Sequence, residues 1–286
     1  MPTVRRLEDL TAFREAAEPF LMRDEARHNL QLGICSRLES DLHAFGDEAP
    51  YLSVAVDGED VVAVAIRTPP FNVLLSRMDP PCAAAFAEDA RGRFASLPGV
   101  NGEPAASAAF AEVWSERSGQ TVTTGMRTRI HRLTSPPAVP AAHGRYRDAT
   151  AEDRGRLVEW FEAFGEEAHP GARHTDASDL VDLRLSGADG GVALWEDEEP
   201  VSLSAHGGAT PNGIRIGPVY TPPDLRGRGY AGACVATQSG RLLAAGHRFC
   251  FLFTDLANPV ANRLYGRLGY EAVCDLEETL FEPAAG

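Results

Sequence analysis

The spacing of hydrophobic residues in the second half of the chain predicts helices and strands in a regular order. A short strand is expected at residues 145–147, followed by a helix that starts with a capping-box spacing between Thr150 and Asp153. Apolar residues recur through that helix at helical spacing. Three strands are then expected at 192–195, 200–206 and 214–220, separated by acidic and Gly/Pro/Asn turns.

The residues that follow continue this alternation. A helix is expected at 229–245, because Gly246 stands where a left-handed C-cap ends a helix. A hydrophobic strand at 247–256, a helix at 258–269 and a closing strand at 270–281 complete the order. This order predicts a mixed α/β fold, in which a mixed central sheet is flanked by helices.

The first half repeats part of the same order. Helices are expected within 13–38, a hairpin at 51–68 with a tight turn at Asp57-Gly58, a strand at 71–78, and helices at 79–90 and 105–114. We interpret this half as a degenerate copy of the second, with an unrelated α/β domain as the alternative. His28 and Asn29 are expected to pack or to face solvent rather than to contact a substrate.

Composition and charge narrow the class of protein. The chain has 286 residues, a formal net charge of −14 and a sequence pI near 5.0, which disfavours nucleic acid or an anionic membrane as partner. Its five cysteines have no metal-ligand spacing, so a reduced compartment and no metal site are expected. No signal-peptide core or membrane-length apolar run is found, and a cytoplasmic location is therefore expected.

One turn carries a chemical signal. Residues 221–232 read TPPDLRGRGYAG, between an expected strand and an expected helix. Glycines let an anion approach the unpaired N–H groups of a helix N-terminus, and Arg226 and Arg228 add charge-assisted hydrogen bonds, so a pyrophosphate is the expected guest. The alternative is a tight turn with solvated arginines. Neither the nucleoside-triphosphate loop nor the GxGxxG pattern is present.

A second motif lies in residues 254–270, TDLANPVANRLYGRLGY. Asn258 is a good N-cap and Pro259 suits the first helical position. Asn258, Asn262 and Tyr265 then fall on one helical face. The alternative is a capped helix whose tyrosine packs in the core.

Together the two motifs resemble those of the GCN5-related N-acetyltransferase (GNAT) family. Residues 226–231, RGRGYA, fit the family's (Q/R)xxGx(G/A) signature, and Asn258, Asn262, Tyr265 and Gly269 fit its second pattern. The resemblance covers residues 145–282. It implies a tandem acyl-CoA N-acyltransferase fold, with a degenerate GNAT-like domain at 1–134, a Pro-rich linker at 135–143 and a catalytic domain at 144–286.

The resemblance also implies roles for individual residues, with acetyl-CoA as cosubstrate. Main-chain groups of Val219, Tyr220 and Thr221 would pair with the pantetheine arm and polarise the thioester. The pyrophosphate would be bound by the amides of Arg226, Gly227, Arg228, Gly229, Tyr230 and Ala231. Asn258 and Asn262 would lie along the pantetheine, and Tyr265 would protonate the departing sulfur.

The general base is less well defined. The strand at 214–220 offers no carboxylate, so His206 on the adjacent strand is the candidate, with a strand-end structural histidine as the alternative. Glu166, Glu167 and His169 lie where the family builds its acceptor site, with a solvated helix end as the alternative for the two glutamates. A water relay to solvent is equally consistent.

The implied reaction is direct transfer of an acetyl group to a primary amine of a small molecule or peptide. A catalytically silent acyl-CoA-binding protein of the same fold is the competing hypothesis, and transfer to a hydroxyl or of a longer acyl group is a third. The acceptor, and whether the chain forms a homodimer, stay open.

Overall fold

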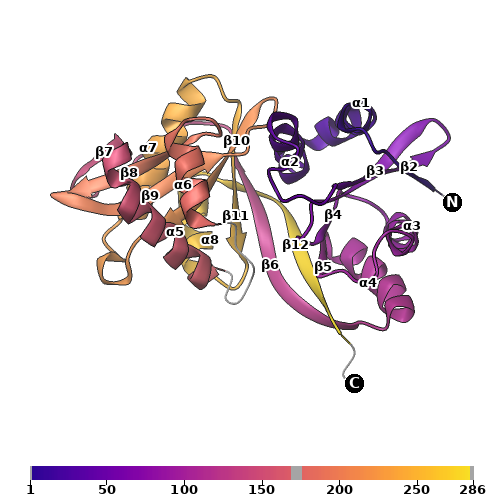
Figure 1. Cartoon of the computed structure of the whole chain (residues 1–286). Coiled ribbons are helices and arrows are strands. Elements are labelled where there is room, and N and C mark those ends of the chain that lie inside the picture. The colour runs from indigo at the N-terminus through magenta and orange to yellow at the C-terminus, as the bar shows by residue number, and fades with distance from the viewer. Residues whose placement is uncertain (1, 169–175, 284–286) are drawn as a thin grey trace. The chain divides into compact units, whose positions relative to one another are not determined.

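The computed structural model describes residues 2–168 and 176–283 (Figure 1). The chain divides into two compact units, of which the first comprises Met1–Ile130, Thr254–Asn258 and Ala272–Gly286. The second comprises His131–Phe253 and Pro259–Glu271. Each unit is assembled from segments that are distant in the sequence, whereas the sequence analysis expects domains that follow one another along the chain.

The first unit is a mixed sheet with helices on both faces. Its strands lie in the order β1-β2-β3-β4-β5-β12-β6. The β1–β2, β2–β3, β3–β4 and β5–β12 pairs are antiparallel, and the β4–β5 pair is parallel. The strands are β1 (Thr3–Arg6), β2 (Tyr51–Asp57), β3 (Asp60–Arg67), β4 (Val73–Leu75), β5 (Gly99–Gly102), β6 (Thr121–Leu133), which ends in the second unit, and β12 (Glu271–Glu282). The helices are α1 (Leu10–Leu21), η1 (Met22–Asp24), α2 (Asn29–Ser40), α3 (Pro80–Arg91) and α4 (Pro104–Ser118).

Alternating residues of β2 and β3 place two hydrophobic clusters on opposite faces of this sheet. Leu52 and Val64 pack with α1 and α2, while Ala55 and Ala63 pack with α3 and α4. Figure 1 shows the same division, with α1 and α2 on one side of the strands and α3 and α4 on the other. The core of the first unit is therefore built on both faces of one hairpin.

The last strand of the chain completes the first unit. In β12, Thr279 lies opposite Val100 of β5, and the sheet order places β6 on its other side. Phe281 is 5% exposed, and its ring centroid lies 6.4 Å from that of Phe110 and 6.1 Å from that of Trp114. The closing strand thus belongs to the core of the unit that the first half of the sequence builds.

His28 has a structural environment in this unit. It is buried, its Nδ1 lies 2.9 Å from the carbonyl oxygen of Leu21, and its Nε2 accepts a hydrogen bond from the Arg77 N–H at 3.2 Å. With both ring nitrogens engaged by the backbone, His28 packs as expected. The adjacent Asn29 is also buried and donates to the carbonyl of Ala26.

The second unit is likewise a mixed sheet between helices. Its strand order is β11-β10-β9-β8-β7, and β10–β11 is its parallel pair. The strands are β7 (Arg145–Asp148), β8 (Gly191–Asp197), β9 (Glu199–Gly207), β10 (Gly213–Tyr220) and β11 (Phe249–Asp255). The helices are η2 (Ala151–Asp153), α5 (Arg154–Ala168), α6 (Ala177–Leu185), η3 (Pro223–Leu225), α7 (Tyr230–Ala244) and α8 (Pro259–Arg267).

The two faces of this sheet carry different helices. Leu157 of α5 and Val181 of α6 pack against Leu203 of β9. Val235 of α7 packs on the other face with Ile214 of β10 and with residues of α8. The predicted mixed α/β fold is confirmed, as is the capping box of Thr150 and Asp153.

Candidate functional site

Strands β10 and β11 of the second unit separate after a short paired stretch. They pair in parallel only where Gly213–Arg215 face Phe249–Phe251, although β10 continues to Tyr220. On its other side β10 stays paired with β9 up to Tyr220, with an irregularity between Ile216 and Val219. One edge of β10 beyond Arg215 therefore has no strand partner in the described residues. An extended ligand can pair with such an edge.

The edge leads to an open helix N-terminus. Gly227 and Gly229 have φ angles of +80° and +86°, in the left-handed region that favours glycine. Gly229 is the N-cap of α7 and no side chain caps that helix. The N–H groups of the first turn of α7 thus remain available, and the helix dipole gives them a partial positive charge. This arrangement fits a pyrophosphate.

Arg226, the first residue of the signature, is held by protein groups. Its Nη2 donates to both carboxylate oxygens of Glu167, at 2.8 and 2.7 Å, and its Nε donates to the carbonyl of Thr221 at 2.8 Å. Arg228 is exposed and donates to the carbonyl of Asp224 at 3.2 Å. The Arg226 guanidinium therefore ties the turn to the end of α5.

The residues before the turn are also partly engaged. The Ser202 hydroxyl donates to the Tyr220 carbonyl at 3.0 Å and lies 2.8 Å from the Thr221 hydroxyl. Val219, half-buried, lies opposite Ser204 of β9. A carbonyl oxygen has two lone pairs, so Tyr220 and Thr221 keep one acceptor position each.

The start of α7 is fixed by side chains on the core side. Tyr230 is buried and its hydroxyl donates to Asp197 Oδ2 at 2.6 Å, while Ala231 is half-buried. A Cβ at Gly229 would lie 3.5 Å from the carbonyl oxygen of Ala141. The Pro-rich segment thus lies against the start of α7.

Tyr265 on α8 has the chemistry expected of an acid. It is 8% exposed, and burial raises its pKa to about 12, so the phenol is protonated at pH 7. Its hydroxyl makes no hydrogen bond with the described residues. The adjacent Tyr270 packs edge-on at 5.8 Å between centroids, and its own hydroxyl is paired with Ser239 at 2.8 Å. Tyr265 therefore has a phenolic donor free for a ligand.

The two asparagines differ in position. Asn262 is half-buried on α8, three residues before Tyr265, so both lie on one side of that helix. Asn258 directly precedes α8, but it belongs to the segment Thr254–Asn258 of the first unit. Its N–H donates to the carbonyl of Asp255 at 3.0 Å.

His206, the candidate base, faces α7. The Nε2 of Gln238 lies 3.1 Å from His206 Nδ1, and because that amide nitrogen can only donate, Nδ1 accepts and the ring proton is assigned to Nε2. Burial, followed by the charges of Arg184 and His247, lowers the pKa of His206 to about 4. The ring is therefore neutral at pH 7, and its low pKa makes it a weak base.

The acceptor-side candidates are only partly described. Glu167 pairs with Arg226, Glu166 is exposed, and His169 lies outside the described residues. The contacts of Glu167 and Ser202 with the turn escaped sequence reasoning, because they join residues 59 and 18 positions apart without a local motif.

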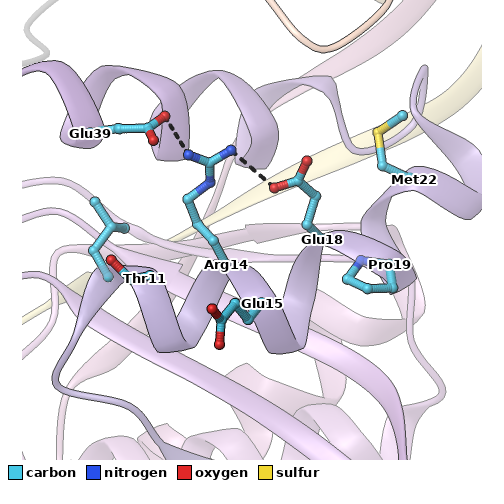
Figure 2. A pocket seen from close by; sticks show the side chains of 8 residues that line it. Thr11, Arg14, Glu15, Glu18, Pro19, Met22 and Glu39 are labelled. Atoms are coloured by element: carbon cyan, nitrogen blue, oxygen red, sulfur yellow. Dashed lines mark hydrogen bonds and ion pairs between the residues drawn. The ribbon is translucent and has the colours of Figure 1, made fainter.

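Other sites offer less. Within residues 2–168 and 176–283, no cluster of three or more His, Cys, Asp or Glu side chains could hold a metal ion, and no helix is long and apolar enough to cross a membrane. A pocket of the first unit lies between α1 and α2, where Arg14 is flanked by Glu18 and Glu39 (Figure 2). Its arginine is already neutralised.

Comparison with known proteins agrees with this fold. Residues 197–280 match the family model described as FR47-like protein. A search of curated proteins found no match. Among solved structures, a Drosophila protein is similar over 100% of both chains, with a TM-score of 0.72 and 13% identity.

Two further similar structures are those of GNAT proteins. An acetyltransferase of the GNAT family from Colwellia psychrerythraea has a TM-score of 0.59 at 10% identity, over 98% of this chain and 99% of its own. A tandem GNAT protein from the clavulanic acid biosynthesis pathway has a TM-score of 0.57 at 13% identity, over 100% of this chain and 99% of its own. At these identities the likeness concerns the fold.

Proposed function

Because the chain has the fold of the tandem GCN5-related N-acetyltransferases and an FR47-like C-terminal domain, we propose that it transfers an acetyl group from acetyl-CoA to a primary amine. The observation that carries the proposal is the continuity of two features. The unpartnered edge of β10 ends in the glycine turn, and that turn opens at the uncapped N-terminus of α7. An extended arm with a pyrophosphate at its end fits this path.

The binding residues follow from the path. The free edge of β10 at Val219 to Thr221 pairs with the pantetheine arm, and the amides of residues 226–231 bind the pyrophosphate. Asn262 lies along the pantetheine, as does Asn258 at the start of α8. Gly227 is essential there because a Cβ would need a strained backbone at φ +80°.

The chemistry is a single displacement. The neutral amine attacks the thioester carbon, the new C–N bond forms and the C–S bond breaks. A backbone N–H near Tyr220 stabilises the negative charge that develops on the carbonyl oxygen, an effect of about 3 kcal/mol in comparable sites. Tyr265 gives its phenolic proton to the departing sulfur, and the raised pKa keeps that proton in place until then.

The amine must also lose a proton. His206 is the proposed acceptor for it, and a water relay to solvent is the alternative. The low pKa of His206 favours the relay, because a base with a pKa of about 4 takes a proton from an alkylammonium poorly.

Tyr265 distinguishes an enzyme from a silent acyl-CoA-binding protein. Binding alone needs no donor at the sulfur, whereas proton transfer does. A phenol that is buried, protonated and without a protein partner supports the enzyme.

Calorimetric titration with acetyl-CoA, followed by a thiol-release assay with a panel of amines, tests the proposal. We expect micromolar binding and amine-dependent release of CoA. The sequence contains no lysine, so acetylation of the protein's own side-chain amines gives no background in the assay. Absence of acetyl-CoA binding would overturn the proposal.

A further inference from the structure

Arg215 stands at the point where β10 and β11 separate. It is the last residue of β10 that pairs with β11, opposite Phe251. Its neighbours Ile214 and Ile216 pack on the α7 face. Because side chains alternate along a strand, Arg215 points to the opposite face, which α5 and α6 cover. The Arg215 guanidinium therefore lies on the face opposite α7, and its residue stands where the free edge of β10 begins.

Arg215 forms no ion pair with a carboxylate of the described residues, although the charge of Asp189 acts on it. Both carboxylate oxygens of Asp189 are already engaged by other groups. Its Oδ2 lies 2.5 Å from Arg184 Nη1, and its Oδ1 accepts a hydrogen bond from the Gly208 N–H at 2.8 Å. The charges of Arg184, Asp189 and Arg215 act on one another, and together these three side chains carry a net charge of +1. The buried Nε of Arg184 also lacks an acceptor.

The backbone is shaped to hold these guanidinium groups. Arg184 lies against Gly207 and Arg215 lies against Gly208, so that a Cβ at either glycine would occupy the space of a guanidinium group. Burial and the nearby charge of Arg184 lower the pKa of Arg215, to about 10, and the group stays charged at pH 7. A partly buried charge without a partner is costly, and a bound anion removes that cost.

Arg14 of the first unit provides a contrast. It also lies between helices, but Glu18 and Glu39 pair with it from two sides (Figure 2). Its charge is balanced within the protein. Arg215 has no such pair, which points to a ligand rather than to a structural ion pair.

We propose that Arg215 binds a carboxylate of the acceptor, so that the acceptor is an aminocarboxylate. The proposal rests on the proposed function, because it assumes that the amine reacts where β10 and β11 part. A guanidinium fork matches the geometry of a carboxylate and binds it with two hydrogen bonds. With the carboxylate on Arg215, the amine is directed to the free edge of β10. A polyamine or an aminoglycoside would instead bring a second positive charge to Arg215.

Initial rates with matched amines test the proposal. The panel contains free amino acids, dipeptides, and the carboxamide of each. We expect kcat/KM for an accepted acid to exceed that of its amide by roughly 10- to 100-fold, the range of a hydrogen-bonded charge. Free amino acids and dipeptides separate the two sources of the carboxylate. The amine of an amino-acid amide is less basic than that of the free acid, so a larger fraction of the amide is neutral at pH 7. This difference by itself favours reaction of the amide, and a preference for the acid therefore cannot arise from it.

Arg215→Gln is expected to bring the acid-to-amide ratio close to one while leaving the Kd for acetyl-CoA unchanged. Arg215→Lys should restore part of the preference. Arg156→Gln, at a half-buried position of α5, is the control with the same change of charge and should keep the full ratio. Equal rates for acids and amides in the wild type, or an unchanged ratio in Arg215→Gln, would overturn the proposal.

A binding measurement tests the subsite without turnover. The Arg184 Nε–Hε resonance exists in both the wild type and Arg215→Gln. It should shift saturably with N-acetylglycine in the wild type, and it should not shift with N-acetylglycinamide. The shift should be lost in Arg215→Gln. No shift with N-acetylglycine in the wild type would overturn the subsite, even if acetyl-CoA binds. Loss of acetyl-CoA binding with a normal shift would overturn only the proposed function.

Discussion

Arg226 donates two hydrogen bonds from a single nitrogen to the carboxylate of Glu167 and a third, from Nε, to the carbonyl of Thr221. The first residue of the phosphate-binding signature is thus turned toward the end of α5. In this arrangement the carboxylate of Glu167 competes with a pyrophosphate for the charge of Arg226.

Removing that competitor should strengthen cosubstrate binding. Glu167→Gln is expected to lower the Kd for acetyl-CoA about 2- to 5-fold, because the exposed pair is worth less than about 1 kcal/mol. Glu159→Gln, at an exposed position of the same helix, is the control for charge and should leave the Kd unchanged. Calorimetric titration with acetyl-CoA at low and high salt measures the Kd of both variants. Weaker binding by Glu167→Gln would mean that the ion pair organises the turn.

Substitution of Gly229 should block the phosphate site. At φ +86° any other residue is strained by about 1–2 kcal/mol, and a side chain there lies over the first N–H groups of α7. Gly229→Val is expected to raise the Kd for acetyl-CoA at least tenfold. Gly240→Ala, inside α7 and in open space, should stabilise the protein by up to about 1 kcal/mol without affecting the Kd. An unchanged Kd in Gly229→Val would remove the turn from the site.

Two tyrosines of one cluster separate catalysis from packing. Tyr265→Phe is expected to keep the Kd for acetyl-CoA and the free energy of unfolding, but to lower kcat by on the order of 10², because a general acid is lost. Tyr270→Phe breaks the pairing with Ser239 and should cost about 1 kcal/mol of stability with little change in kcat. Steady-state rates and urea unfolding distinguish the two. A normal kcat in Tyr265→Phe would refute its assigned role.

The low pKa of His206 predicts a pH dependence of stability. Its folded pKa, about 4, lies below the unfolded value of 6.5, so between these values the unfolded chain binds more protons. Stability from this group is present above pH 6.5 and is lost as pH falls toward 4. His206→Gln should flatten this part of the curve, measured as the urea midpoint from pH 4.5 to 7.5. An identical slope in the variant would show that His206 is not responsible.

The same histidine gives a kinetic criterion. If His206 is the base, its protonation removes activity only near pH 4. A change of kcat/KM with pH near neutrality then reports the titration of another group, such as the acceptor amine. His206→Gln should then abolish turnover across the pH range. Unaltered turnover would leave the water relay as the route of the proton.

Phe281 should control the stability of the first unit. Phe281→Ala removes a buried ring stacked on Phe110 and Trp114 and is expected to cost about 3–5 kcal/mol. Leu42→Ala, 57% exposed and also in the first unit, is the control and should change stability by less than about 0.5 kcal/mol. Chemical unfolding followed by tryptophan fluorescence measures both, and a small effect of Phe281→Ala would contradict the packing described for β12.

Sequence reasoning predicted most elements of the second unit, because their signals are local. The capping box, the left-handed glycine at 246 and the strands at 192–220 each depend on a few neighbouring residues. Helix α6, strands β1 and β6 and the short β5 were not foreseen. β5 is Gly-Val-Asn-Gly, a poor strand former by composition, which is held in place by β4 and β12.

The candidate site divides in the same way. The glycines of the turn and Tyr265 follow from spacing, whereas the ion pair of Glu167 and the unpaired charge of Arg215 depend on contacts between distant segments. Arg215 in particular reads as an ordinary polar residue of an alternating strand. Only the fold shows that Arg184 already occupies the carboxylate of Asp189, which leaves Arg215 without an ion pair.

The position of β12 between β5 and β6 has a consequence for biosynthesis. A ribosome delivers residues 1–130 long before residues 272–282, so the emerging first unit carries two open strand edges until the last strand is released. Exposed edges of this kind template pairing with other chains. The first unit thus depends on protection of these edges until β12 has been synthesised, and deletion of β12 would damage the part of the protein that is made first.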